Sequence, residues 1–515
     1  MKKISLGNLN LHTEILETHI TDSTSMISSV QQDSRLVQKD SCFTAFSGIH
    51  TDGHSFIPQA CKAGAALIIH EQAFQDDWLS HSPHTNFIRV ADSRRAFSAI
   101  AAQLYDYPAE SLPIIGVTGT DGKSTTVSLL HQLLQAAGVR NGYISTVSMN
   151  DGKQEKKNHL RQSTPEADEI HSMLRQMIEN GCRCAIVEAT SHGLSDKTAR
   201  LADVPFRIGI ITNITHEHLE FHGNFEQYRH DKSKLFQKLV GTQAAAIINA
   251  DDKNCLSMLD ILPPSVQAYT YSIQSTSADY YAKITQTGPE GSDFSLYGPE
   301  KLAQPVHTRL AGEVNVANIL AASLAAAHFL QSPQEAILGY IPQLHGPKGR
   351  MMPISCGQDF SVFVDYAHTP GSFTKILPMM KGITSGKLIV VFGSAGERDK
   401  EKRAMQGEIA SQYADIIILT NEDPRAEDPQ AILNDIASGI AQKKAEKSVY
   451  LIPDRRMAIQ TAFQLSQKND LVLLLGKGHE GTIQFATHSL DWDEAKIAKV
   501  LLHEMLTNKQ QNETT

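Results

Sequence analysis

Thr118-Gly-Thr-Asp-Gly-Lys-Ser-Thr-Thr126 is the stretch of this 515-residue chain that decides the fold, because it joins an expected strand to an expected helix. The apolar run at 112–117 predicts a buried strand, and the apolar spacing after Ser124 predicts a helix that stops near Gly138. A glycine-rich turn between a strand and a helix is typical of a loop that binds phosphate groups. The stretch therefore predicts an α/β domain that holds a nucleotide.

Each residue type in this loop suits a nucleotide. Gly119 and Gly122 let the backbone bend so that its N–H groups face an anion, Lys123 can reach the terminal phosphates, and the Ser124 hydroxyl can bind Mg²⁺. The spacing is not the strict one, since the usual first glycine would fall on Val117 and glycine lies one residue earlier. We interpret the loop as a nucleotide site rather than a structural turn.

Composition limits the class of protein without identifying its chemistry. With 515 residues, 41% of them hydrophobic and 20% charged, the chain is long enough for about three soluble domains. The net charge of −9 argues against non-specific binding to nucleic acid. Apolar runs such as 416–419 and 471–475 have the length of strands and are too short to cross a bilayer. Six cysteines in a chain of this length suggest a reducing compartment, so we expect a cytoplasmic protein.

Alternating strand and helix patterns predict an α/β fold of three domains. We expect an N-terminal α/β domain over residues 1–107, a central parallel-sheet ATPase domain with the phosphate loop over 108–343, and a C-terminal Rossmann-like domain over 344–515. The first boundary depends on a proline-containing linker at 105–113, and the second on the turn-forming sequence at 345–349.

Polar residues or glycines follow several of the predicted strands. They are Glu188, Asn213, Asp365, Gly393, Asn421 and Gly476. Because open parallel sheets place their ligands at the carboxyl ends of the strands, these residues predict a cleft between two α/β units.

The order and spacing of many short motifs resemble those of the Mur ligases, ATP-dependent enzymes that form amide bonds in peptidoglycan precursors. The resemblance covers about residues 30–490. Its motifs are Asp33-Ser-Arg35, Asp52-Gly-His-Ser-Phe56, Thr118–Thr126, Ser163-Thr-Pro-Glu166, Glu188-Ala-Thr-Ser-His-Gly193, Asn213-Ile-Thr-His-Glu-His-Leu219, Tyr228–Phe236, Asn249-Ala-Asp-Asp252, Gly312–Asn318, Asp365-Tyr-Ala-His368, Gly393–Asp399, Glu422-Asp-Pro-Arg425 and Gly476-Lys-Gly-His-Glu480. The chain is most similar to the members that add the third amino acid, to UDP-N-acetylmuramoyl-L-alanyl-D-glutamate. The resemblance implies that the N-terminal domain binds this UDP-substrate and that the C-terminal domain binds the amino acid.

The resemblance also implies a mechanism, in which ATP converts the glutamyl carboxylate of the substrate into an acyl phosphate that an amine then attacks. Such a reaction gathers anionic groups, so positive charge and metal ions are expected around them. Ser124 and Glu188 would hold one Mg²⁺, and His218 would help to hold a second. The expected catalytic residues are Lys123, Lys232, His218 and Glu188.

Lys232 lies where the family has a lysine that CO₂ carbamylates to N6-carboxylysine. Carbamylation turns a cation into a carboxylate, and it requires a lysine whose pKa is lowered. From composition alone, a solvated lysine beside Lys234 in a charged helix is the simpler interpretation. The register of Tyr228 and 235–236 with the family motif favours carbamylation.

The resemblance implies two sets of nucleotide contacts. The UDP-substrate is expected to contact Ser34, His50, Thr51, Ser163, Thr164, Ser191, Thr198 and Arg200. ATP is expected to contact Thr118, Gly119, Thr120, Asp121, Gly122, Lys123, Ser124, Thr125, Asn315, Asn318, Arg350 and Asp365. The chain departs from the family pattern at three points: the segment between Ser191 and Asn213 is about two residues longer than usual, Thr198 stands where glutamine is common, and Asp121 replaces the commoner asparagine.

The last domain is expected to select the amino acid. The residues expected there are Arg398, Glu422, Asp423, Pro424, Arg425, Gly476 and Glu480. Family members that add meso-diaminopimelate usually carry Asp-Asn-Pro-Arg, whose arginine binds the distal carboxylate. Here Arg425 favours a carboxylate, whereas Asp423 favours an extra ammonium, and neutralisation of Arg425 by Glu422 or Asp423 would favour a basic amino acid. The chain predicts a diamino acid, with meso-diaminopimelate, L-lysine and L-ornithine all open.

Two other functions stay open at this point, a ligase similar to folylpolyglutamate synthase and a P-loop nucleotide switch. The motifs near 33–54 and at 422–425 argue against the first. The second is disfavoured because the sequence shows neither a guanine-binding Asn-Lys-x-Asp nor a clear Walker-B aspartate. The expected cofactors are ATP and Mg²⁺. The expected partners are small-molecule substrates, with no nucleic acid, no membrane insertion and a monomeric chain.

Overall fold

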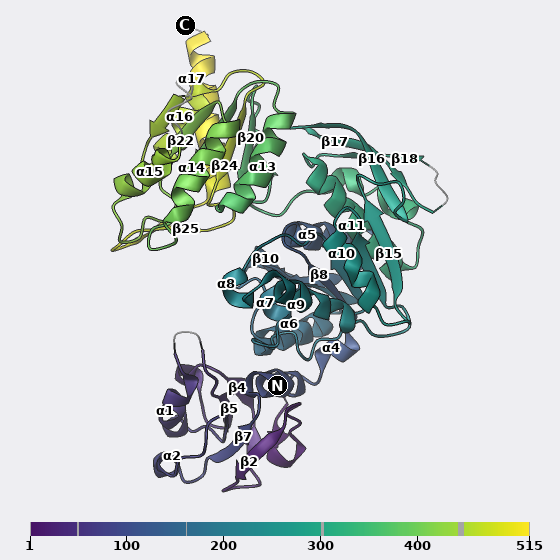
Figure 1. The fold of residues 1–515 in the computed structure, drawn as a ribbon, viewed down its shortest axis with the longest axis vertical. Coiled ribbons are helices and arrows are strands. Elements are labelled where there is room, and N and C mark those ends of the chain that lie inside the picture. The colour runs from purple at the N-terminus through teal and green to yellow at the C-terminus, as the bar shows by residue number, and fades with distance from the viewer. Residues whose placement is uncertain (1, 49–50, 161, 300–302, 441–447, 514–515) are drawn as a thin grey trace. The chain divides into compact units, whose positions relative to one another are not determined.

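A computed structural model describes residues 2–48, 51–160, 162–299, 303–440 and 448–513 (Figure 1). The chain divides into two compact units. The first unit comprises Met1–Ala282, Leu296–Leu302 and Ala317–Tyr340, and the second comprises Lys283–Ser295, Ala303–Val316 and Ile341–Thr515. Two short segments of the expected central domain thus group with the second unit, and the domain boundaries after residues 107 and 343 stay predictions.

The N-terminal part of the first unit is a five-stranded sheet in the order β2-β7-β6-β5-β4. Strands β4 to β7 run parallel, and β2 pairs with β7 in the antiparallel sense. Helix α3 covers one face with Phe97 and Ile100, and α1 and α2 cover the other with Ile57 and Trp78. The elements are β1 (Ile4–Ser5), β2 (Ile15–His19), β3 (Met26–Ile27), β4 (Ser29–Gln31), β5 (Ser41–Thr44), α1 (Ile57–Lys62), β6 (Leu67–His70), α2 (Asp77–His81), β7 (Asn86–Val90), α3 (Ser93–Leu104) and α4 (Pro108–Ser111).

The phosphate loop belongs to an eleven-stranded sheet in the order β11-β10-β9-β12-β8-β13-β14-β15-β16-β17-β18. The strands from β9 to β16 in that order are parallel. The strands β9, β12, β8, β13 and β14 are buried at every residue, as is usual for a parallel sheet that is covered on both faces. Helices α6 and α9 contribute Leu174 and Phe236 to one core, and α5 packs against β8, β9 and β12.

The elements around this sheet follow in chain order. They are β8 (Ile114–Thr118), α5 (Lys123–Ala136), β9 (Asn141–Ile144), β10 (Ser148–Asn150), β11 (Glu155–Lys157), α6 (Ala167–Glu179), β12 (Cys184–Glu188), α7 (Ser191–Leu194), β13 (Ile208–Ile211), α8 (Leu219–His222), α9 (Phe225–Gln237), β14 (Ala245–Asn249), α10 (Lys253–Leu256), β15 (Gln267–Ser272), β16 (Tyr280–Gly288), β17 (Gly291–Tyr297), β18 (Ala303–Thr308), α11 (Glu313–Leu330) and α12 (Glu335–Leu338).

The second unit contains a six-stranded sheet in the order β19-β20-β24-β21-β22-β23. All strands except β19 are parallel. Helices α13, α14 and α15 cover one face, and α16 and α17 cover the other, which makes a doubly wound α/β layer (Figure 1). The elements are β19 (Met352–Pro353), β20 (Ser361–Asp365), α13 (Pro370–Ile383), β21 (Leu388–Phe392), α14 (Glu401–Tyr413), β22 (Ile416–Leu419), α15 (Pro429–Ser438), β23 (Ser448–Leu451), α16 (Arg455–Leu465), β24 (Leu471–Leu475), β25 (Thr482–Gln484), β26 (Ser489–Asp491) and α17 (Glu494–Glu513).

A buried ion pair joins α16 to α17. The guanidinium of Arg455 lies 2.6 Å from Oε1 of Glu494, and the two side chains are 1% and 0% exposed. Arg455 also donates to the carbonyl oxygens of Asn421 at 3.0 Å and Leu475 at 2.7 Å. One guanidinium therefore holds the carboxyl ends of β22 and β24 together.

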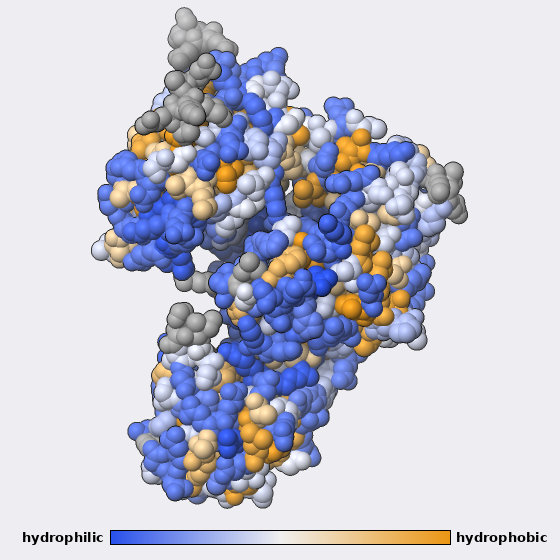
Figure 2. Space-filling view, viewed as in Figure 1, coloured by the Kyte–Doolittle hydropathy of each residue, from blue (hydrophilic) through white to orange (hydrophobic). Residues whose placement is uncertain are grey.

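Helix α11 was not foreseen from the sequence. Its length and composition would suit a membrane span, but 67% of its apolar window is buried inside the protein, where Ile319, Leu320 and Ala322 are fully covered. A buried core helix passes the same test, so α11 is weak evidence for a membrane. Figure 2 shows a mostly hydrophilic face with scattered apolar side chains.

Candidate active site

The phosphate loop turns sharply between β8 and α5. Gly119 and Gly122 have φ angles of +142° and +83°, which favour glycine. A Cβ at Gly119 would collide with the Thr212 hydroxyl, and one at Gly122 would lie 2.5 Å from Oδ1 of Asn318. Thr212 and Asn318 therefore fix the loop closely. The glycines are needed at these positions whatever the loop binds.

Lys123 opens α5 and folds back over this loop. Its Nζ donates to the carbonyl oxygen of Thr120 at 2.8 Å. The backbone N–H groups of Thr120 and Asp121 are held by Asn213, through its carbonyl at 2.8 Å and its Oδ1 at 2.9 Å. Thr118 and Thr125, the other loop residues predicted to bind ATP, are buried and half-buried.

Glu188 ends β12 with a buried carboxylate that accepts four hydrogen bonds. Oε2 accepts from Ser124 Oγ at 2.9 Å, Ser145 Oγ at 2.7 Å and the Thr146 N–H at 3.0 Å, and Oε1 accepts from Thr146 Oγ1 at 2.8 Å. Burial acts to raise its pKa, but the charge of Lys123 and these hydrogen bonds prevail, so the pKa is lowered. Glu188 is thus held as an anion beside the loop.

Lys232 lies on the third turn of α9 and points at the same loop. Its Nζ donates to the carbonyl oxygen of Gly119 at 2.6 Å and lies 4.5 Å from the centre of the Tyr228 ring. Burial lowers the pKa of Lys232 well below its usual value, and the charge of Lys123 lowers it further. Tyr228 also bonds to the hydroxyl of Thr120 at 2.9 Å, which ties α9 to the loop.

His218 occupies the outer side of this region. Its side chain is 43% exposed, with Nδ1 3.5 Å from Glu220 and Nε2 3.8 Å from Glu217. Its φ is +56°, and its ring lies 4.8 Å from that of His192. Within the described residues no contact joins His218 to Ser124 or Glu188, so its predicted metal role stays a prediction.

Several predicted UDP-substrate residues gather after β12. The Thr164 hydroxyl donates to the carbonyl oxygen of Glu188 at 2.7 Å, and Arg200 donates to that of Thr164 at 3.1 Å. Arg200 also lies 2.7 Å from Glu166, while its buried Nε has no partner. The Thr198 hydroxyl already has a local hydrogen-bond partner, because it donates to the carbonyl oxygen of His192.

Other predicted UDP-substrate residues show fewer contacts. Ser163 is half-buried. Ser34 is buried and donates to Gln59 at 2.9 Å, and Thr51 accepts a backbone hydrogen bond from Gly48 at 2.9 Å. His50 lies outside the described residues.

Ser191 begins α7 and belongs to a buried hydrogen-bond chain. Its Oγ lies 3.0 Å from Nε2 of His222, and Nδ1 of His222 lies 2.8 Å from Asp231. Burial lowers the pKa of His222, although Asp231 acts in the other direction. The ring is therefore held in its neutral form.

In the second unit, the predicted ATP residues surround the end of β20. Asp365 accepts from the N–H groups of Met351 and Ala367, both at 2.8 Å. Burial raises the pKa of Asp365, although Arg350 opposes this. Arg350 lies 5.0 Å from the centre of the Tyr366 ring, and its buried Nε has no partner. Asn315 donates to the carbonyl oxygen of Ala311 at 2.8 Å. Asn318, another predicted ATP residue, belongs to the first unit, where it accepts from the Thr126 hydroxyl.

Apart from Arg398, which lies between β21 and α14, the predicted amino-acid residues follow β22 and β24. Glu422 is buried, and its Oε2 has no hydrogen-bond partner. The same oxygen packs closely against Gly476, because a Cβ at that position would lie 2.8 Å from it. Burial raises the pKa of Glu422, with the charges of His368 and Lys402 opposing. Arg425 has a φ of +53° and a buried Nε without a partner.

A buried lysine neutralises two of the acids in this region. Nζ of Lys477 lies 2.8 Å from Asp423 and 2.5 Å from Glu480, and its side chain is 0% exposed. Tyr366 donates to the other oxygen of Glu480 at 3.2 Å. Arg398 is exposed and Pro424 is buried. Asp423 is therefore already paired, whereas Arg425 forms no ion pair with a carboxylate of the described residues.

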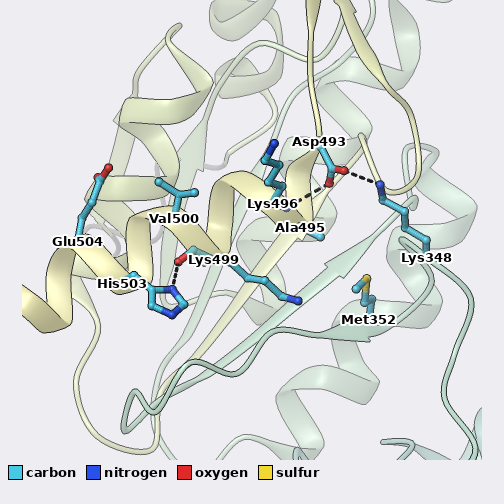
Figure 3. A pocket seen from close by; sticks show the side chains of 9 residues that line it. All are labelled: Lys348, Met352, Asp493, Ala495, Lys496, Lys499, Val500, His503 and Glu504. Carbon is cyan, nitrogen blue, oxygen red and sulfur yellow. Dashed lines mark hydrogen bonds and ion pairs between the residues drawn. The ribbon is translucent and has the colours of Figure 1, made fainter.

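A separate cavity of about 610 Å³ lies along α17. In Figure 3, Lys348 and Asp493 face one another in an ion pair of 2.6 Å, and Lys499 and His503 follow along the helix. None of its lining residues belongs to the predicted sites. Its lysine side chains are exposed, which makes it a surface hollow rather than a built catalytic site.

Sequence analysis missed Ser145 and Thr146, which donate to Glu188. They follow β9, a parallel strand beside β12. The short strand at 141–144 would have been the signal, because its end must lie at the same edge of the sheet as Glu188.

Comparison with known proteins places the chain among ligases. Family models match residues 26–105 (Mur ligase family, catalytic domain), 117–326 (Mur ligase middle domain) and 349–478 (Mur ligase, glutamate ligase domain). A UDP-N-acetylmuramyl-tripeptide synthetase from Roseiflexus sp. (strain RS-1) is 43% identical over 93% of this chain and 95% of its own length. A UDP-N-acetylmuramoyl-L-alanyl-D-glutamate--2,6-diaminopimelate ligase from Bacillus licheniformis is 36% identical over 93% and 95%.

A solved structure agrees. The structure of a UDP-N-acetylmuramoyl-L-alanyl-D-glutamate--2,6-diaminopimelate ligase superposes with a TM-score of 0.66 at 28% identity, covering 93% of this chain and 95% of that one. The chain belongs to the Mur ligase family, and it is an ATP-dependent ligase of peptidoglycan synthesis. The predicted resemblance and the predicted three-domain α/β fold are confirmed.

Proposed function

We propose that the enzyme joins the glutamyl carboxylate of UDP-N-acetylmuramoyl-L-alanyl-D-glutamate to an amino group of a diamino acid, with ATP as the energy source. The supporting comparison is the match to tripeptide synthetases along nearly the whole chain. The observation that carries the chemistry is the anionic Glu188 beside Ser124, with the amino groups of Lys123 and the buried Lys232 both bonded to carbonyl oxygens of the phosphate loop. The other two functions have no comparable support.

The proposed reaction begins with a phosphate transfer. The N–H groups at the start of α5 and the Lys123 amino group would hold the ATP phosphates, and the carboxylate of the substrate would attack the terminal phosphorus to give an acyl phosphate and ADP. The amine would then attack the acyl carbon and release inorganic phosphate. Lys123 suits this role because it opens α5, where positive potential from the helix adds to its charge.

The chain also fits Mg²⁺. A lowered carboxylate pKa at Glu188 and a neighbouring Ser124 hydroxyl provide the hard oxygen ligands that Mg²⁺ prefers. No group of three or more His, Cys, Asp or Glu side chains that could hold a metal occurs among the described residues, which fits an ion that completes its shell with water and phosphate. When bound, Mg²⁺ would neutralise charge on the transferred phosphoryl group.

Lys232 would act as a carbamate. An uncharged amine is the form that adds to CO₂, and burial together with the charge of Lys123 favours that form. The product is an anion that would sit beside the loop, within reach of the charge of Lys123. This would convert a neutral amine into an acceptor for orienting phosphate or metal.

The amino acid is proposed to be a diamino acid. Arg425 keeps an unpartnered Nε and would accept a distal carboxylate, as in meso-diaminopimelate. Glu422 keeps an unpartnered Oε2 and would accept an ammonium, as in L-lysine or L-ornithine. Because Asp423 is engaged by Lys477, we expect Glu422 rather than Asp423 to contact the ammonium.

The test uses purified enzyme with ATP, Mg²⁺ and the UDP-dipeptide. Each of the three diamino acids is supplied separately, and ADP, phosphate and amide product are measured. We expect ADP release to require both the UDP-dipeptide and one diamino acid, with one amide formed per ADP. ATP hydrolysis that is indifferent to both would contradict the proposal and support a nucleotide switch, and turnover of a folate substrate would support the other ligase.

We further propose that the enzyme acts in the cytoplasm as a monomer on small-molecule substrates, without nucleic acid or membrane insertion. Its six cysteines are all free, which suits a reducing compartment. Gel filtration and cell fractionation test both statements.

A further inference from the structure

Three side chains from different helices form a buried chain of hydrogen bonds beside the candidate site. Asp231 precedes Lys232 in α9, His222 ends α8, and Ser191 begins α7. The two bonds measure 2.8 Å from Asp231 Oδ2 to His222 Nδ1 and 3.0 Å from His222 Nε2 to Ser191 Oγ. Exposure is 0% for Asp231, 3% for His222 and 2% for Ser191. We call these three residues the relay.

The direction of the relay follows from the group at its end. A carboxylate can only accept, so Nδ1 of His222 carries the hydrogen that bonds to Asp231. In the neutral ring, Nε2 is then an acceptor, and the hydroxyl of Ser191 donates to it. The Ser191 oxygen keeps its lone pairs, and no donor among the described residues contacts them.

Asp231 is itself held in place. Its other oxygen, Oδ1, accepts from Lys234 Nζ at 2.9 Å and from Gln227 Nε2 at 3.2 Å. Two donors at Oδ1 fix the carboxylate plane, so Oδ2 has a set position for His222. The relay therefore begins at Asp231, whose carboxylate is held in one orientation on α9.

The far end of the relay lies among the predicted UDP-substrate contacts. Ser191 follows Thr190, whose hydroxyl lies 2.8 Å from that of Thr164 and accepts from the Gly193 N–H at 3.1 Å. A Cβ at Gly193 would lie 2.5 Å from Thr164. This tight packing leaves Ser191 few alternative positions once His222 holds it.

We propose that His222 and Asp231 are positioning residues that fix the hydroxyl of Ser191 as a hydrogen-bond acceptor for an N–H or O–H group of the UDP-substrate. This inference rests on the proposed function, since it concerns the same substrate. Neither His222 nor Asp231 touches the reacting atoms. Both act through Ser191.

The first test reverses the relay with Asp231→Asn. Lys234 and Gln227 would keep the amide oxygen of the new side chain at the Oδ1 position, so its NH₂ would face Nδ1 of His222. The ring must then carry its hydrogen on Nε2, and Ser191 must accept instead of donate. We expect KM and Kd for the UDP-dipeptide to rise about tenfold, with kcat and the KM of ATP changed less than about threefold.

A double-mutant cycle then distinguishes positioning from general support of the fold. Ser191→Ala is expected to weaken UDP-dipeptide binding by about the same factor, and the double variant is expected to be no worse than Ser191→Ala alone. Losses that multiply in the double variant, or an Asp231→Asn enzyme equal to wild type, would overturn the inference.

One further variant tests the inference if Asp231→Asn fails to fold, and another serves as the control. His222→Asn can still donate to Asp231 but no longer reaches Ser191, so it should match Ser191→Ala even if Asp231→Asn fails to fold. Asp196→Asn is the matched control, because Asp196 lies 2.8 Å from the same Lys234 yet its side chain is 88% exposed. It should behave as wild type.

Calorimetry with the UDP-dipeptide alone separates this inference from the proposed function. A wild-type enzyme that makes the amide while Asp231→Asn binds normally overturns only the relay. A wild-type enzyme that neither binds the UDP-dipeptide nor forms amide overturns both.

Discussion

Lys232 in the first unit and Lys477 in the second are both buried lysines, 1% and 0% exposed, but their surroundings differ. Lys477 lies between two carboxylates, at 2.8 Å from Asp423 and 2.5 Å from Glu480. Lys232 meets a carbonyl oxygen and an aromatic ring, and no carboxylate of the described residues lies within ion-pair distance of it. The two lysines therefore differ in whether a carboxylate of the described residues lies at ion-pair distance.

That difference distinguishes a lysine with a structural role from the lysine that we propose reacts with CO₂. A buried cation between two anions is stable as a cation and holds the elements that carry them. A buried amine without a countercharge is stable only when neutral, which leaves it able to react with CO₂. Burial alone would not have distinguished the two roles.

The largest expected effect comes from removing the unpaired amine. Lys232→Ala should lose nearly all ligase activity, because the proposed carbamate is lost with it. Formate or acetate at high concentration should restore part of the activity by supplying a carboxylate. Lys238→Ala is the matched control, since Lys238 lies at the end of the same helix and donates to the carbonyl oxygen of Ala202 at 2.5 Å.

The modification itself can be detected. Wild-type enzyme in ¹³C-bicarbonate should show a carbamate carbon signal that is absent from Lys232→Ala. Acidification should remove the signal because it protonates the amine and releases CO₂, and neutral bicarbonate should restore it. Full turnover by Lys232→Ala would contradict the proposed reactive role of Lys232 and its distinction from Lys477.

Glu188→Gln should follow in size. Glutamine removes the anion, and because its amide nitrogen cannot accept, at least one of the four hydrogen bonds to Glu188 must be lost or reversed. We expect kcat to fall on the order of 100-fold and the Mg²⁺ requirement to rise. Turnover measured across a Mg²⁺ titration checks this, with the exposed Glu179→Gln as control.

Lys477→Met should act on stability before it acts on chemistry. It leaves Asp423 and Glu480 without their shared cation, and we expect a loss of about 3 kcal/mol in the free energy of unfolding of the second unit. Urea unfolding measures it. Lys348→Met removes an ion pair whose side chains are 47% and 37% exposed, and should cost less than about 1 kcal/mol. Equal costs for the two variants would contradict the structural role of Lys477.

Arg425→Ala is expected to have the smallest effect and the most specific one. The KM for the amino acid should rise roughly tenfold while the KM for ATP stays unchanged. The loss should be confined to diaminopimelate if Arg425 binds a distal carboxylate. Kinetics with all three diamino acids decide this, and Arg456→Ala, from an exposed pair with Glu504, is the control.

Local signals predicted the phosphate loop well. The expected strand and helix around it became β8 (Ile114–Thr118) and α5 (Lys123–Ala136), and the strands at 416–419 and 471–475 have the predicted bounds. Each of these is an uninterrupted apolar run or a glycine-punctuated turn, whose signal is contained within a few neighbouring residues.

Long-range pairings were out of reach. Nothing near Asp423 in the sequence shows that Lys477 neutralises it, and nothing near Ser191 shows that His222 and Asp231 align it. Short elements were also missed, such as β9 and the α4 turn inside the expected linker, because four residues carry too little periodicity. The sequence thus predicted candidate site residues, but it did not show which of them the fold pairs with an opposite charge.

The ion pair between Arg455 and Glu494 has a consequence for the end of the chain. Cleavage before Glu494 would leave the buried guanidinium of Arg455 without its carboxylate partner. Arg455 also donates to the carbonyl oxygens of Asn421 and Leu475, the residues that immediately precede Glu422 and Gly476. Proteolytic trimming of the carboxyl terminus is therefore expected to impair recognition of the amino acid, although α17 supplies none of the residues predicted to bind it.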